Sequence, residues 1–443
     1  MKYLLFFWFW HFLFEISEHI IFRVRKVGYL PDHVAHIGIA RYSKLPQILF
    51  SHMQLFTICG IEDGEVSLKP LQKEDDVISS SANGLKIAFV LHGLSGYRST
   101  YTSTCLALAS KGYFVISPEF GDSTPASSLL PDGFVRYYHQ FMGSLKSQEY
   151  QDFRQGQLEH RTHEMNTIMQ FLQSVTSGSD SQMKKFQPHI RWKSLVPSSS
   201  SLFSSSNFVN SLQRQPLDFS DPLIVGHSFG GANAIYLASN ISSPECQNFR
   251  KRYGLGGLIL YDPWMFPLSN SLREGMETIH SYQTFKSSNP SKIRSLPILC
   301  LHAEKFQWPE NLEFENQVIR YDNQSKLKQT TQLLPHHFIY QIRLEDAGHM
   351  NYTEASYLAP YIMSRMKSVG IQDPNQLLRD INEITVEFSQ LIEDQRVKKR
   401  VQKKENGKDS SNLISSSQQR FEKKLSEKKN FTLLYSKIPK NDP

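Results

Sequence analysis

The chain has 443 residues, 40% of them hydrophobic, which is enough for one large domain with extensions or for two domains. Its net charge of +7 is concentrated in residues 396–443, which carry 14 lysines and arginines against 5 acidic residues. The rest is therefore close to neutral, without the basic and aromatic patch of a nucleic-acid-binding protein. Four cysteines with no C-x-x-C pair argue against a disulfide framework and a zinc pattern.

Residues 1–26 begin with an apolar run from Tyr3 to Phe14, and basic residues follow it. The run is shorter than the roughly 20 residues that span a bilayer, and no small-x-small cleavage site follows it. An anchor lying in or on a membrane is favoured, with a cleaved secretory signal and a buried helix as alternatives. We therefore expect a membrane-associated protein and leave open whether it is secretory or faces the cytoplasm. Residues 27–80 give only short predicted strands.

The first confident unit spans residues 85–117. Residues 85–91 form an almost continuous apolar run, typical of a strand buried on both faces of a parallel sheet. A helix over 101–110, a glycine turn and a strand over 113–117 complete a βαβ unit. Residues 147–173 follow as a long amphipathic helix. The serine-rich stretch 174–206 is predicted to be a flexible surface insertion.

The stretch Gly226-His227-Ser228-Phe229-Gly230-Gly231-Ala232 joins a short apolar run to a helix of small residues. The turn pair Asp221-Pro222 precedes it. A G-x-S-x-G sequence between a strand and a helix is typical of a nucleophile elbow, in which a sharp turn exposes the serine hydroxyl. The following helix directs free N–H groups at charge that develops on an attacked carbonyl.

Further strands are predicted at residues 256–261, 296–302 and 338–344, and helices at about 354–367 and 374–395. Repeated strand–helix alternation predicts an α/β domain over residues 27–395, with a mostly parallel sheet and helices on both faces. The basic residues 396–443 are predicted to be a disordered tail, because they are rich in charge and poor in apolar residues.

Three side chains with complementary chemistry follow strands of this sheet. Ser228, Asp262 and His349 occur in the chain order used by α/β-hydrolases, and strand ends are where sites form in such sheets. Ser228 would be the nucleophile, His349 the general base, and Asp262 the carboxylate that orients His349. Backbone N–H groups of Leu94 and Phe229 would hold the oxyanion. No metal and no cofactor are required.

Both partners of Ser228 have rivals in the sequence. For the base, five other histidines lie near predicted strand ends: His92, His227, His302, His336 and His337. His349 is favoured because it follows the last strand in an Ala-Gly-His loop, whereas His92 and His227 flank turns and are expected to pack or hydrogen-bond locally. For the acid, topology alone does not separate Asp262 from Glu304, which follows the next strand.

Several motifs resemble the plasma (type II) platelet-activating factor acetylhydrolase family, a branch of the α/β-hydrolases. The matching residues are His92-Gly93-Leu94 with Tyr97-Arg98, the Gly226–Ala232 stretch, Asp262 with Trp264-Met265-Phe266-Pro267, and Glu304 with Phe306-Gln307. The resemblance covers roughly residues 85–395 and implies that Asp262 is the triad acid, with Glu304 in reserve. Residues 27–80 lack the early strands expected of the family.

The resemblance implies calcium-independent hydrolysis of a short or oxidised sn-2 acyl chain from a phospholipid. The expected partners are therefore the phospholipid substrate and a membrane surface, with no nucleic acid; the oligomeric state is left open. Two other functions are weighed: a general carboxylesterase or lipase, and a membrane-tethered, non-catalytic binding protein on a hydrolase scaffold. The presence of all three triad residues disfavours the binding protein.

Overall fold

The computed structural model describes the greater part of the chain. The described residues are 24–28, 34–45, 47, 57–61, 84–130, 133–144, 147–178, 216–239, 243–268, 296–306, 308–319, 338–365, 367–370, 372–404 and 411–437. The apolar segment at the N-terminus and almost all of the serine-rich stretch 174–206 lie outside them. Within these ranges, no helix is long and apolar enough to cross a membrane.

The centre of the molecule is a seven-stranded sheet with the order β11-β10-β9-β8-β7-β3-β4. Its strands are β3 (Leu85–Leu91), β4 (Tyr113–Ile116), β7 (Leu217–His227), β8 (Gly257–Tyr261), β9 (Ile298–Ala303), β10 (Ile339–Leu344) and β11 (Phe431–Lys437). All pairs are parallel except β10 with β11. Every residue of β3, β8 and β9 is buried, as the continuous apolar runs predict.

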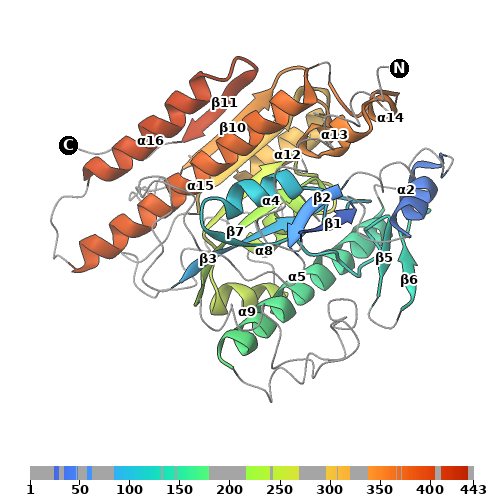
Figure 1. Ribbon diagram of the computed structural model, residues 1–443, viewed down its shortest axis with the longest axis horizontal. Coiled ribbons are helices and arrows are strands. Elements are labelled where there is room, and N and C mark those ends of the chain that lie inside the picture. Colours follow the sequence, from blue (N-terminus) through green and yellow to red (C-terminus); the bar gives the residue numbers. More distant parts are fainter. Residues whose placement is uncertain are drawn as a thin grey trace.

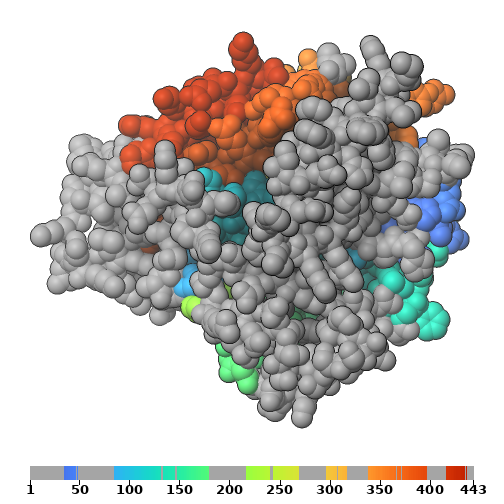
Figure 2. All heavy atoms as spheres, viewed as in Figure 1, coloured from blue at the N-terminus to red at the C-terminus, as the bar shows by residue number. Residues whose placement is uncertain are grey.

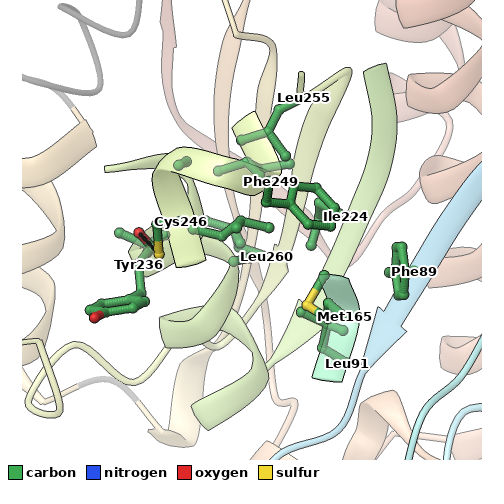
Figure 3. Close-up of a cluster of buried hydrophobic side chains, with 14 of the residues drawn as sticks. Phe89, Leu91, Met165, Ile224, Tyr236, Cys246, Phe249, Leu255 and Leu260 are labelled. Atoms are coloured by element: carbon green, nitrogen blue, oxygen red, sulfur yellow. Dashed lines mark hydrogen bonds between the residues drawn. The ribbon is translucent and has the colours of Figure 1, made fainter. Parts of the chain in front are cut away.

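Helices cover both faces of this sheet (Figure 1). One face packs against α5 (Gln148–Thr176), α8 (Phe229–Ala238) and α9 (Pro244–Arg252), and the other against α4 (Thr102–Ala109), α15 (Pro374–Lys404) and α16 (Ser411–Ser426). Alternate residues of each strand serve the two cores: Phe89 and Leu260 belong to the first, Val90 and Ile259 to the second. Figure 3 shows part of the first core. The predicted α/β-hydrolase architecture is confirmed.

Smaller elements lie around the sheet. Residues before it form α2 (Ala35–Ser43) and an antiparallel pair, β1 (Val24–Gly28) with β2 (Thr57–Ile61), which does not join the central sheet. A second pair, β5 (Ser127–Leu129) with β6 (Val135–Tyr137), follows β4. Short helices flank the last strands: η5 (Glu304–Phe306), α12 (Pro309–Ile319), η7 (His349–Tyr352), α13 (Ala355–Leu358) and α14 (Pro360–Arg365).

Prolines account for two differences from the predicted boundaries. The expected turn at Asp221-Pro222 lies inside β7, where Asp221 has φ 53° and the pairing with β3 shifts register. The helix expected over 354–367 is divided into α13 and α14. Ala359 leaves the helical region there, because the following Pro360 disfavours the α conformation of the residue before it.

Over its described residues, 396–404 and 411–437, the prediction of a disordered tail is wrong. Helix α15 continues to Lys404, α16 packs beside it, and β11 extends the sheet; in Figure 2 the red C-terminal residues lie directly against the orange ones. Average composition concealed an apolar stripe, in which Phe421 and Leu425 of α16 are buried. The lysines are accommodated by acidic residues of α15: Lys424 pairs with Glu383 and Lys428 with Asp380.

Removal of the Phe421 side chain tests this correction. Phe421 is fully buried, with its ring 4.8 Å from that of Tyr340 and 5.6 Å from that of Phe388. We expect Phe421→Ala to lower the free energy of unfolding by about 3–5 kcal/mol in urea titrations. Tyr361→Ala, at a position 75% exposed, is the matched control and should change it by less than about 0.5 kcal/mol. Equal effects of the two substitutions would show that α16 is not packed on the domain.

Candidate active site

Ser228 occupies the sharp turn between β7, which ends at His227, and α8, which begins at Phe229. Its backbone is strained, with φ 56° and ψ −116°. Two glycines allow the turn by close backbone approach. A Cβ on Gly226 would lie 2.3 Å from the Gly230 carbonyl oxygen, and one on Gly230 would lie 2.1 Å from the Leu91 carbonyl oxygen. The predicted elbow conformation is therefore present.

The loop after β8 is tied to this turn through the backbone. The Ser228 N–H donates to the Tyr261 carbonyl at 2.9 Å, and the Trp264 N–H donates to the Ser228 carbonyl at 3.0 Å. Asp262 lies between these two contacts, with φ 42°, and its own N–H donates to Leu301 of β9 at 2.9 Å. The serine turn and the aspartate are thus fixed relative to each other.

Asp262 and His349 form a hydrogen-bonded pair. The His349 Nδ1 lies 3.0 Å from Asp262 Oδ2, and the two side chains are 20% and 1% exposed. The other oxygen, Oδ1, accepts from the Ala303 N–H at 2.7 Å and faces the Tyr352 hydroxyl at 3.4 Å. Glu304, the reserve acid, is exposed and accepts from the Asp346 N–H at 2.7 Å. The structure therefore brings Asp262 to His349.

Burial controls the protonation of this pair. It lowers the pKa of His349 to about 3, so the imidazole is neutral at physiological pH and able to accept a proton. Burial also raises the pKa of Asp262 to about 7, which the Ala303 N–H and the neighbouring imidazoles oppose. The ring of Phe306 stacks on His349 with centroids 3.5 Å apart and fixes its orientation.

The histidines at the turns hydrogen-bond locally, as expected. His92 Nδ1 contacts the Gly93 carbonyl at 2.7 Å, and its Nε2 accepts from the Phe120 N–H at 3.3 Å. His227 is buried, with Nδ1 2.7 Å from the Tyr101 hydroxyl and Nε2 3.0 Å from the His349 carbonyl oxygen. Both nitrogens of His227 are therefore engaged, Nδ1 with Tyr101 and Nε2 with the His349 loop. His336 and His337 lie outside the described residues.

The loop that carries Leu94 lies beside Ser228. A Cβ on Gly93 would lie 3.0 Å from the Cβ of Ser228, and the Gly93 N–H donates to the Tyr101 hydroxyl at 3.3 Å. The side chain of Arg161, fully buried on α5, donates to the His92 carbonyl at 2.8 Å.

Sequence reasoning missed Arg161 and Tyr101 as supports of this loop. The signal available for Arg161 was its position on the apolar face of the long helix, three residues after Leu158 and four before Met165. Its Nε also donates to the buried Asp122 carboxylate at 2.8 Å, which compensates the buried charge.

Two clusters of described residues hold potential metal-ligand atoms within 4.8 Å of one another: His227, Asp262 and His349, and Cys300, His302 and Glu315. In the first, ring nitrogens of His227 and His349 are engaged in the hydrogen bonds above. In the second, His302 pairs with Glu315, which also accepts from Gln341. We interpret the first cluster as the hydrogen-bonded pair of His349 and Asp262 with His227 beside it, and the second as a buried polar network.

Comparison with known proteins identifies the family of the chain. The family model of platelet-activating factor acetylhydrolase, isoform II, matches residues 25–413. The chain is 21% identical to platelet-activating factor acetylhydrolase of Gallus gallus over 383 residues, covering 82% of this chain and 74% of the relative. It is 24% identical to the Cavia porcellus protein of the same name, covering 68% of this chain and 55% of the relative.

Two further proteins are similar to the chain. A putative phospholipase A2 of Schizosaccharomyces pombe is 22% identical, covering 69% of this chain and 68% of that protein. The solved ferulic acid esterase of Streptomyces cinnamoneus aligns with a TM-score of 0.38 and 14% identity, covering 70% of this chain and 67% of that chain. Because the isoform II model matches most of its length, the chain belongs to the platelet-activating factor acetylhydrolase family.

Proposed function

We propose that the chain is a serine hydrolase of phospholipid esters, in which Ser228, His349 and Asp262 form the catalytic triad. The observation that carries this proposal is the His349–Asp262 hydrogen bond at the end of the sheet where the strained Ser228 turn lies. A neutral imidazole held by a buried carboxylate is the arrangement that activates a serine hydroxyl.

In the proposed reaction, the Ser228 hydroxyl oxygen attacks the ester carbonyl while His349 takes its proton. The backbone N–H groups of Leu94 and Phe229 stabilise the resulting oxyanion. As the C–O bond to the alcohol breaks, His349 returns the proton to the leaving group, and the acyl chain remains on Ser228. Water then repeats the sequence and releases the acid. Asp262 keeps the Nδ1–H of His349 in place throughout.

We propose a short or oxidised sn-2 acyl chain of a phospholipid as the group removed. The relatives named platelet-activating factor acetylhydrolase support this substrate class. The surroundings of His349 support an apolar acyl group: Phe306 stacks on it, Trp308 lies 5.1 Å from Phe306 and Phe266 lies 5.8 Å from Trp308, between ring centroids. A general carboxylesterase or lipase is the second candidate, which differs in chain length.

We also propose that the chain meets its substrate at a lipid surface. Phe266 and Trp308 are 36% and 42% exposed, so the aromatic series that begins at His349 continues to the protein surface. Aromatic side chains of this kind suit the interface between lipid and water. A substrate drawn from that interface would reach His349 along apolar contacts.

A substrate panel tests the function. We expect the purified chain to hydrolyse sn-2 acetyl and short oxidised phospholipids faster than long-chain phospholipids, triacylglycerols and p-nitrophenyl esters. Ser228→Ala should abolish hydrolysis and labelling by a fluorophosphonate, because it removes the nucleophile. Ser110→Ala, an exposed serine at the end of α4, is the control and should retain both. Absence of a Ser228 adduct in the unaltered chain would favour the binding-protein alternative.

Substitution of the acid separates Asp262 from Glu304. Asp262→Asn should lower kcat by about 10⁴-fold, because an amide favours the wrong tautomer of His349. Glu304→Gln should change kcat by less than about threefold, since its carboxylate is exposed and accepts from the Asp346 N–H rather than from His349. Both variants should unfold at the temperature of the unaltered chain within a few degrees. If Glu304→Gln were the more damaging change, Asp262 would not be the acid.

The pH dependence follows from the raised pKa of Asp262. As the pH falls through about 7, the carboxylate takes up a proton and can no longer hold the Nδ1–H of His349, whose own pKa of about 3 keeps it neutral. We expect kcat/KM to be constant above this point and to fall about tenfold per pH unit below it, as a property of the coupled pair. A rate that is flat between pH 5 and 9 would contradict this assignment.

A further inference from the structure

A buried polar network lies directly behind Asp262. A small cavity is lined by Asp262, His302 at the end of β9, and Asn311 and Glu315 of α12. The exposed fractions are 2% for Asp262, 3% for His302 and 0% for Glu315. Ionisable side chains are rarely buried to this degree unless they are paired, so this grouping requires an explanation beyond packing.

Helix α12 contributes to two parts of this network. His302 Nε2 lies 3.0 Å from Glu315 Oε1, and Gln341 of β10 donates to the same oxygen at 2.9 Å. Asn311, one turn earlier on α12, accepts from the Met265 N–H at 2.7 Å and donates to the Pro263 carbonyl at 3.0 Å. The same helix therefore holds both the loop of Asp262 and the partner of His302.

We infer that His302 and Glu315 are positioning residues: a buried charge pair that keeps Asp262 ionised for His349. This inference rests on the proposed triad and adds two residues to it. A carboxylate 3.0 Å away favours the protonated imidazole, and an imidazolium at the cavity wall would favour the negative form of Asp262. Neither residue touches the reacting atoms.

The other groups that face Asp262 do not bring a positive charge to it. From η7, His349 and the Tyr352 hydroxyl contact its oxygens; from β9, the Ala303 N–H does so. His227 of β7 also faces it, but burial holds the pKa of His227 well below its usual value, so it is neutral. The positive charge of His302 lowers the pKa of Asp262, whereas the negative charge of Glu315 raises it. The two residues therefore have opposite effects on the ionisation of Asp262.

The test uses His302→Gln in the full chain, because glutamine can hydrogen-bond to Glu315 but cannot carry a charge. The rate of fluorophosphonate labelling at Ser228 is measured from pH 5 to 9. We expect the fall in rate at low pH, here called the acid limb, to move upward by about one pH unit. The reason is that Glu315 is then left without its counter-charge. In His302→Gln/Glu315→Gln the opposing charge of Glu315 is also absent, so the limb should return only part of the way, because the favourable charge of His302 is still missing.

The control is Lys86→Gln, which removes one partner of another buried ion pair, with Asp218. Lys86 lies near the start of β3, and parallel strands place this end of the sheet opposite the triad. It should lower the melting temperature without moving the limb. If His302 and Glu315 only stabilised the fold, His302→Gln would likewise lower the melting temperature and leave the limb in place. An unmoved limb would therefore overturn the inference.

Two further measurements keep the outcomes distinct. The NMR shift of the His349 Nδ1–H, which is hydrogen-bonded to Asp262, reports the charge on Asp262 without any reaction at Ser228, and its pH dependence should show the same displacement in His302→Gln. Failure to label Ser228 therefore overturns the proposed function, whereas an unchanged NMR titration overturns this inference. A limb that moved when EDTA was added would also overturn it, because a metal ion among Cys300, His302 and Glu315 would then supply the charge.

Discussion

The strained backbone at Ser228 is the constraint on which the site depends. A non-glycine residue at φ 56° and ψ −116° persists only when its surroundings hold it there. Three contacts do so: the end of β3 approaches Gly230, the end of β8 accepts the Ser228 N–H, and the loop after β8 donates back to the Ser228 carbonyl. The contacts that stabilise the turn therefore also place the Gly93–Leu94 loop and Asp262 beside the serine.

Hydrogen bonds between buried groups extend this arrangement to the base. The Gly93 N–H contacts the Tyr101 hydroxyl, which contacts His227, and His227 contacts the His349 carbonyl. One side of the site is thus linked to the other through a side chain that the proposed reaction does not use. In a buried environment such bonds are strong, and leaving one partner unsatisfied would be costly. This explains why two histidines lie next to each other while only His349 is joined to Asp262.

The features that the sequence predicted depend on residues close together in the chain, whereas those that it missed depend on contacts between distant residues. The β3 strand, the β7–Ser228–α8 turn and the His349 loop follow from apolar runs and glycine spacing within a few residues. The choice between Asp262 and Glu304 could not be made this way, because both follow adjacent strands. It is made by the positive φ of Asp262 and by the Ala303 N–H, which belongs to another strand. Arg161 and Glu315 were missed for the same reason, since their partners are distant in sequence.

The basic C-terminal residues show how composition can mislead about both structure and partners. From composition alone, residues 396–443 are predicted to be a disordered tail. In the fold, Lys424 and Lys428 are paired with acidic residues of α15, so part of that charge is neutralised within the domain. β11 pairs with β10, and the Asn430 carbonyl accepts from the Glu345 N–H, four residues before His349. The segment therefore supports the strand that delivers the base, and its first role is to complete the sheet.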